Sequence, residues 1–246
     1  MKNKSIFSLM IYNTYIWIFP VSQIIFSIIC CFTQTQVSSY PELNYLLISN
    51  NNMQLFLFYI PILLIILIPI HSVLENDLLC VRCKSHLKVY EIKVMSALKL
   101  TTLVVLIKLI NEIVFSVITN SQWVIFASAD YVFLYFIQFG TIFFTFLVYY
   151  LFCEITTNSA LAVLMYLFIF GLDFLLSMLP INGVFYELNL FCAPMSLTLQ
   201  YVVSLFEGNP PNYVFHIFYM MSKIISVIII TCLLICRKRR EHFVKA

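Results

Sequence analysis

Glycine is scarce in this chain, and its scarcity excludes a class of function. Only four of the 246 residues are glycine, so a glycine-rich loop that cradles nucleotide phosphates cannot be assembled. The sequence also lacks a His-Glu-x-x-His zinc helix, a Gly-x-Ser-x-Gly nucleophile elbow and a paired-glutamate protease helix. We therefore expect no catalytic residue, no metal site and no cofactor bound by this chain, which is not expected to be an enzyme.

Charge is equally scarce. Charged side chains make up 10% of the sequence and hydrophobic ones 62%, which leaves no room for a separate soluble domain, so residues 1–246 are expected to form one membrane domain. The net charge of +3 is explained by cytoplasmic anchoring and does not indicate nucleic-acid binding. No small-x-small cleavage site follows the first apolar run, so that run is expected to be retained.

What the chain has instead is long apolar stretches, each 19 to 23 residues long. Each is long enough to cross a hydrocarbon core of about 30 Å as a helix. The sequence therefore predicts an all-α, polytopic membrane protein with six transmembrane helices. They lie near residues 12–32, 54–74, 96–118, 132–152, 161–179 and 214–236.

The basic residues predict an orientation. Of the 14 lysines and arginines, all but Lys108 and Lys223 precede the first span, fill the second connection or the first turn of the next helix, or follow the last span. The first, third and fifth connections contain none. The positive-inside rule then places both termini in the cytoplasm. The abundance of Ile, Phe, Tyr and Asn suits an AT-rich bacterial genome, so we expect a multi-pass protein of the bacterial cell membrane.

Two of the connections between predicted spans are expected to contain structure beyond a simple turn. Residues 180–213 are apolar yet punctuated by proline and glycine, which predicts a re-entrant external hairpin that buries itself in the outer leaflet. Residues 75–95 mix acids and cations with apolar positions at roughly helical spacing, which predicts a short amphipathic cytoplasmic element. Cys80 and Cys83 lie in this element, but a single C-x-x-C lacks a second pair of ligands, and we interpret both as incidental thiols.

Four ionisable residues fall inside the predicted spans, namely Lys108, Glu112, Asp173 and Lys223. Lys108 and Glu112 are one helical turn apart, and Asp173 and Lys223 lie at matching depths on consecutive spans. Charges at that depth cost about 2.5–3.5 kcal/mol each on insertion scales, so they should face the bundle or a wet cavity. One interpretation is a polar substrate path or proton relay. The favoured one is two structural ion pairs, Lys108 with Glu112 and Asp173 with Lys223.

A short motif in the 75–95 segment is similar to one in a known family. It reads Glu75-x-x-Leu78-Leu79-x-x-Arg82-x-Lys84-Ser85, followed by Tyr90-x-x-Lys93. With six spans and cytoplasmic termini, it resembles the membrane subunit of bacterial ABC-2 type ABC transporters, most of all the small permeases of lantibiotic or bacteriocin export and self-immunity. Asn76, Asp77, Cys83 and His86 depart from the family pattern.

The resemblance implies a permease that exports a peptide, amphiphile or drug. It implies that Glu75, Leu78, Leu79, Arg82, Lys84 and Ser85 dock into a separate cytosolic ATPase, where ATP and magnesium bind. It also implies a second copy of this permease or a paralogue beside it in the lipid bilayer. The alternatives are a non-transporting membrane immunity or scaffold protein and the substrate-binding subunit of an uptake system; an intramembrane enzyme is disfavoured because the site motifs are missing.

Overall fold

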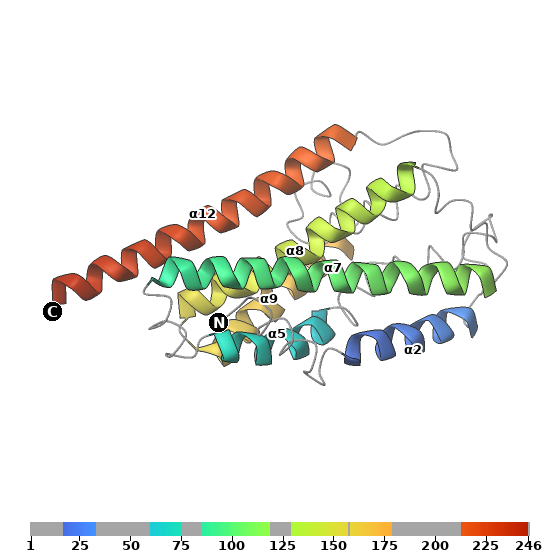
Figure 1. The fold of residues 1–246 in the computed structure, drawn as a ribbon, viewed down its shortest axis with the longest axis horizontal. Helices are drawn as coiled ribbons and strands as arrows, with labels where there is room; N and C mark the ends of the chain where they lie inside the picture. Colours follow the sequence, from blue (N-terminus) through green and yellow to red (C-terminus); the bar gives the residue numbers. More distant parts are fainter. Residues whose placement is uncertain are drawn as a thin grey trace.

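The computed structural model describes residues 17–32, 60–74, 85–118, 129–156, 158–178 and 213–245. Within them the chain forms six α-helices and no β-strand (Figure 1), so the predicted all-helical class is confirmed for this part of the chain. The helices are α2 (Ile18–Phe32), α5 (Ile60–Leu74), α7 (His86–Ile118), α8 (Ala129–Thr156), α9 (Ser159–Met178) and α12 (Tyr213–Lys245).

Each helix overlaps one predicted span. Two of them contain stretches long and apolar enough to cross a membrane, Tyr135–Thr156 in α8 and Ile217–Arg237 in α12. Three others are apolar but shorter over their described residues, with stretches at Ile18–Ile29, Ile60–Ser72 and Ser159–Leu172. By length and composition alone, the structure therefore supports membrane association more weakly than six full spans would.

The helices form a bundle around α8 (Figure 1). Helix α8 packs against α7, α9 and α12, while α2 packs chiefly on α7. Following the colours along each helix shows that successive helices run in alternating directions, so the start of α7 and the ends of α8 and α12 lie toward the same end of the bundle. The last turns of α12 extend past the other helices.

The central position of α8 follows from its composition. Residues 140–150 are buried without a break, and most of them are aromatic or aliphatic. A helix that is apolar all round belongs in the interior of a bundle or membrane protein. Its buried rings continue into neighbouring helices: the ring centroid of Tyr149 lies 6.0 Å from that of Tyr166 on α9 and 5.6 Å from that of His71 on α5.

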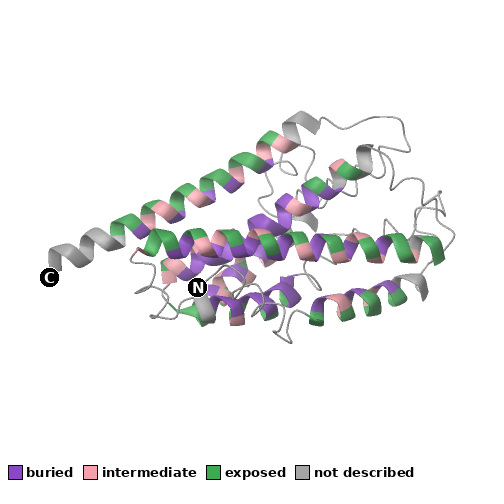
Figure 2. Ribbon diagram, in the orientation of Figure 1, coloured by how far each residue is buried: buried purple, intermediate pink, exposed green. Residues whose placement is uncertain are grey.

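Many of the residues exposed on the outside of the bundle (green in Figure 2) are apolar as well. Large aliphatic and aromatic side chains stand exposed along α2, α7, α9 and α12, with Phe168 at 66% and Phe218 at 70% of their full accessibility. Monomeric soluble proteins rarely expose large apolar patches, so exposed apolar side chains in this number point to a surface that a membrane or partner covers.

The observed start of helix α7 differs from the predicted start of the third span. Residues 86–95 were predicted to belong to a separate element, but they form the first turns of a helix that continues unbroken to Ile118, about 50 Å in all. No proline or glycine interrupts residues 86–118, so nothing in the sequence ends the helix before the apolar part. The carbonyl of Ser85 accepts hydrogen bonds from the amides of Lys88 and Val89 at 3.1 and 3.2 Å and starts the helix there.

The connection between α8 and α9 is also tighter than predicted. Residues 153–160 were expected to form it, yet α8 ends at Thr156 and α9 begins at Ser159. The side chain of Asn158 accepts a hydrogen bond from the amide of Ala160 at 2.9 Å and caps α9. The two helices thus form an antiparallel hairpin.

Helices α8 and α12 approach closely at Gly140. A Cβ atom added there would overlap the sulfur and methyl end of Met220. Because the end of a methionine side chain is flexible, we expect Gly140→Ala to be tolerated. Gly140→Leu adds a bulk that this end cannot clear and should destabilise the fold by about 1–3 kcal/mol.

Unfolding of the purified protein in mixed detergent micelles measures this effect. Ala160→Leu at the exposed start of α9 is the matched control, and Met220→Ala should rescue Gly140→Leu. Unchanged stability in Gly140→Leu would show that the helices are not in close contact there.

Candidate functional site: a buried polar network

Two oppositely charged side chains lie inside the bundle on α7. Lys108 and Glu112 are each 2% exposed, and Lys108 Nζ lies 3.4 Å from Glu112 Oε1. The pairing expected from their spacing is thus observed. Lys108 lies about 15 Å along the helix from Ile118, well inside the apolar part of α7.

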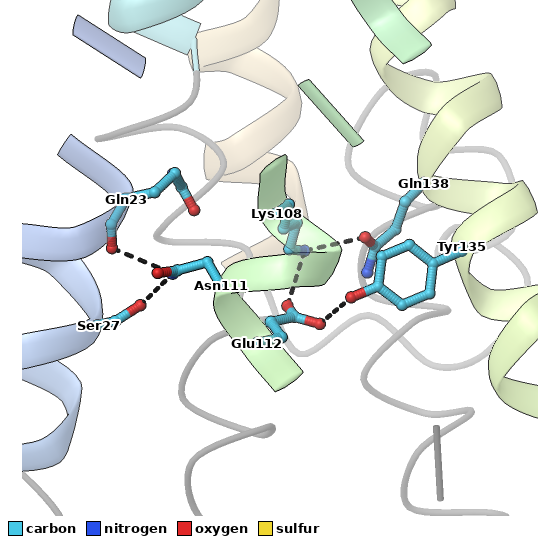
Figure 3. Close-up of polar contacts among 7 residues, drawn as sticks. All are labelled: Gln23, Ser27, Lys108, Asn111, Glu112, Tyr135 and Gln138. Atoms are coloured by element: carbon cyan, nitrogen blue, oxygen red, sulfur yellow. Dashed lines mark hydrogen bonds and ion pairs between the residues drawn. The ribbon is translucent and has the colours of Figure 1, made fainter. Parts of the chain in front are cut away.

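Helix α8 supplies a polar partner to each member of the pair (Figure 3). Lys108 Nζ donates a hydrogen bond to Gln138 Oε1 at 3.0 Å, and the Tyr135 hydroxyl donates one to Glu112 Oε2. Gln138 and Tyr135 are themselves buried. A buried ion pair offsets the loss of hydration only when further hydrogen bonds satisfy its remaining donors and acceptors, and these two side chains provide such bonds.

A third helix is attached through Asn111, which lies between the two charged residues on α7. Its side-chain amide donates to the backbone carbonyl of Gln23 at 3.3 Å and to the hydroxyl of Ser27, both on α2. Gln23 and Ser27 are buried, 3% and 2% exposed. Asn111 thereby joins the inner face of α2 to the level of the ion pair.

We call this set the polar network. It comprises Gln23, Ser27, Lys108, Asn111, Glu112, Tyr135 and Gln138. Three helices thus place one cation, one anion, amides and hydroxyls at one level of the bundle. The chemistry available there is ion pairing and hydrogen bonding.

Sequence reasoning found only two members of this network. Polar residues inside apolar stretches were the available signal, and Gln23, Asn111 and Gln138 are all visible in that way. The sequence alone does not show which helix each of them faces. The spacing of one turn identified the Lys108–Glu112 pair because both residues lie on one helix.

A second ion pair lies nearer the start of α7. Lys93 Nζ donates to Glu154 Oε1 of α8 at 3.2 Å, with Lys93 3% and Glu154 19% exposed. Lys93 was predicted to lie in the connection before the third span; in the structure it lies within α7, and its side chain is buried between helices. The nearby Tyr90 is also buried; burial chiefly raises the pKa of its hydroxyl, and the Thr231 hydroxyl of α12 opposes the rise.

The remaining predicted site residues are only partly covered by the structure. Lys223 is half-buried on α12, with Nζ 4.1 Å from the centre of the Tyr219 ring, but the side chain of Asp173 lies outside the described residues, so their pairing stays a prediction. The predicted external hairpin at 180–213 falls on residues that are not described, apart from the first residue of α12. So do five of the six predicted coupling residues, Glu75, Leu78, Leu79, Arg82 and Lys84.

The part of the chain that the structure describes contains no group of three or more His, Cys, Asp or Glu residues placed to hold a metal ion. Cys80 and Cys83 lie outside that part.

Comparison with known proteins gives no family for this chain. No protein-family model, no curated protein and no solved structure matches it significantly.

Proposed function

We propose that this chain is a six-span permease subunit of the bacterial cell membrane that exports a peptide or amphiphile, powered by a separate cytosolic ATPase. One observation carries the proposal: an apolar-faced helical bundle encloses a buried, hydrogen-bonded ion pair. Exposed apolar faces favour lipid, and buried charge within a lipid-embedded bundle supports a functional site. We take up the substrate path, the less favoured of the two interpretations given for Lys108 and Glu112, alongside their structural pairing.

The outward faces support the membrane part of the proposal. Transfer of apolar surface out of water is worth about 25 cal/mol per Å², so exposed rows on α2, α7, α9 and α12 favour burial in lipid. The basic residues agree with this placement. Lys88 at the start of α7 and Arg237 near the end of α12 are exposed, and these two helix ends lie toward the same end of the bundle. That end would face the cytoplasm.

The continuity of α7 supports the transport part. Its first turns expose Leu87, Lys88 and Glu91, directly after the segment proposed to dock into the ATPase. The same helix carries Lys108 about 33 Å further along. A displacement of its cytoplasmic end by the ATPase would therefore reach the polar network through one rigid element.

The docking segment gives the test of this function. In the triple variant Leu78→Ala, Leu79→Ala, Arg82→Glu, the apolar anchors are truncated and the rim charge is reversed. We expect an ATPase encoded beside this gene to be lost from the complex, with recovery at least about tenfold lower. Insertion should be unchanged, because Lys84 and Lys88 still hold this connection inside.

The measurement is co-purification of the co-expressed ATPase, with membrane abundance as the reference. Leu161→Ala combined with Leu164→Ala, on the exposed face of α9, removes comparable apolar surface elsewhere and should leave recovery intact. Full ATPase recovery with the triple variant would contradict the docking role. Absence of any ATPase from the wild-type complex would instead favour a non-transporting immunity or scaffold protein.

A further inference from the structure

The net positive charge of the chain is concentrated at the end of α12. Residues 237–245 contain five lysines and arginines and one glutamate, which gives a net charge of +4 with His242 neutral. Because the whole chain carries +3, residues 1–236 carry a net charge of −1. The positive-inside rule needs only a few cations beside a span, whereas residues 237–240 are four consecutive cations.

Helix α12 brings these cations to the boundary of the apolar region. Its apolar stretch ends at Arg237, whose side chain is exposed, and the helix continues without a break to Lys245. At 1.5 Å per residue, residues 237–240 occupy about 5 Å along the helix axis. The headgroup region of a bilayer is about 5–8 Å thick on each side of the hydrocarbon core, so these four positions fall within it.

The four cations do not occupy one face of the helix. Successive helical positions are about 100° apart, so residues 237–240 together go round the whole circumference. A protein groove meets one face of a helix, whereas lipid can surround it. Helix α12 leaves room for lipid, because 28% of its apolar stretch is buried, compared with 83% in α8, and its last turns extend past the other helices (Figure 1).

We propose that the end of α12 binds anionic phospholipids of the surrounding bilayer through Arg237, Lys238, Arg239 and Arg240. A cation just beyond a transmembrane helix raises the association of an anionic headgroup by about fivefold. Phosphate oxygens are strong acceptors for guanidinium and ammonium donors. The inference rests on the membrane part of the proposed function and is independent of transport and of the ATPase.

The lipid around one position can be measured with a tryptophan that brominated lipids quench. Trp17→Phe and Trp123→Phe remove the two native tryptophans. Leu233→Trp, the α12 reporter, then lies one turn before Arg237, and Leu164→Trp, the α9 reporter, is the matched control. The two positions are equally exposed, at 64% and 63%, but no lysine or arginine lies in the connection between α8 and α9.

The full chain is reconstituted in equal mixtures of phosphatidylcholine and phosphatidylglycerol in which one of the two lipids is brominated. At the α12 reporter, we expect the association constant of phosphatidylglycerol to exceed that of phosphatidylcholine by about fivefold. At the α9 reporter, the two constants should be nearly equal. Salt at about 1 M should remove the preference at the α12 reporter, because it shortens the Debye length to about 3 Å.

Two charge variants assign the preference to the basic residues. Arg237→Gln, Lys238→Gln, Arg239→Gln and Arg240→Gln together remove the cations and should make the two association constants nearly equal at the α12 reporter. Arg237→Lys, Arg239→Lys and Arg240→Lys together keep the charge and should keep the preference. Quenching at the α9 reporter should be the same in both variants, which checks that the bundle is still embedded in lipid.

Equal association of the two lipids at the α12 reporter, without the charge variants, would overturn the proposal and favour a soluble acidic partner for these cations. A preference that survives the glutamine variant would also overturn it, because the selection would then come from elsewhere in the chain. Inorganic phosphate should leave the preference intact at an ionic strength where chloride does so; loss of the preference would assign the cations to a free anion.

No ATPase is present in these measurements. Equal association of the two lipids would therefore refute this inference and leave ATPase docking standing. Loss of ATPase docking, in turn, would leave the lipid preference standing.

Discussion

Replacing Glu112 by leucine is expected to destabilise the folded chain by about 3–5 kcal/mol. The substitution leaves the Lys108 ammonium 2% exposed without its counter-charge, and it removes the acceptor of the Tyr135 hydroxyl. An uncompensated charge in a low-dielectric interior costs more than any packing that leucine adds. Of the contacts that Figure 3 shows for Lys108, the variant keeps the hydrogen bond to Gln138.

The double variant Lys108→Met, Glu112→Leu should recover much of that loss, because no charge then stays buried. Thr102→Leu, at an exposed position of the same helix, is the matched control and should change stability little. Equilibrium unfolding in mixed detergent micelles, together with membrane abundance, gives the comparison. Additive losses, with the double variant worse than either single one, would show that the two side chains do not act as a pair.

The helices could be predicted because the signal lies in each segment separately. Long apolar runs bounded by polar residues identified all six described helices, and their overlap with the predicted spans follows from that. The errors concern the residues at which helices begin and end. Residues 86–95 were assigned to a connection because they are charged, although charge does not end a helix; α7 continues through them because the chain contains no breaker there.

The site was predictable only where one helix contains both partners. Lys108 and Glu112 meet by local geometry, so their spacing was sufficient. Tyr135, Gln138, Gln23 and Ser27 come from two other helices, and their contacts depend on how those helices are rotated and stacked. Hydropathy measures how apolar a segment is and contains no information on which face meets which neighbour.

Lys93 shows the same limitation for a charge. Its position in a cationic connection gave no sign of burial, yet its side chain is buried against Glu154 of α8. The partner lies 61 residues further along the chain, in a segment where a single acidic residue near a helix end gave no signal of pairing.

Lys93 and Glu154 differ in exposure, so replacing one or the other should lower the free energy of unfolding by different amounts. Glu154→Leu leaves the Lys93 ammonium buried at 3% exposure and is expected to cost about 2–3 kcal/mol. Lys93→Met leaves a carboxylate that is 19% exposed, keeps contact with water, and should lose about 1 kcal/mol or less. Glu154 lies two residues before the end of α8, where the helix dipole disfavours a carboxylate by about 0.3–1 kcal/mol. Glu154→Leu relieves this repulsion, and the gain is too small to reverse the order.

The same unfolding experiment measures both variants beside the double Lys93→Met, Glu154→Leu, which should be more stable than Glu154→Leu alone because it leaves no buried charge. Lys88→Met, at an exposed position on the first turns of α7, removes the same charge from the same end of the helix and is the matched control. The Lys93–Glu154 pair joins α7 to α8, and the Lys108–Glu112 pair lies on α7 facing α8. Because Lys108 and Glu112 are each almost fully enclosed, replacing Glu112 should cost more stability than replacing Glu154. An equal loss of stability in Lys93→Met and Glu154→Leu would contradict this prediction. It would mean that partial exposure does not solvate the Glu154 carboxylate, and that the start of α7 lies deeper in the low-dielectric interior than the exposed Lys88 and Glu91 indicate.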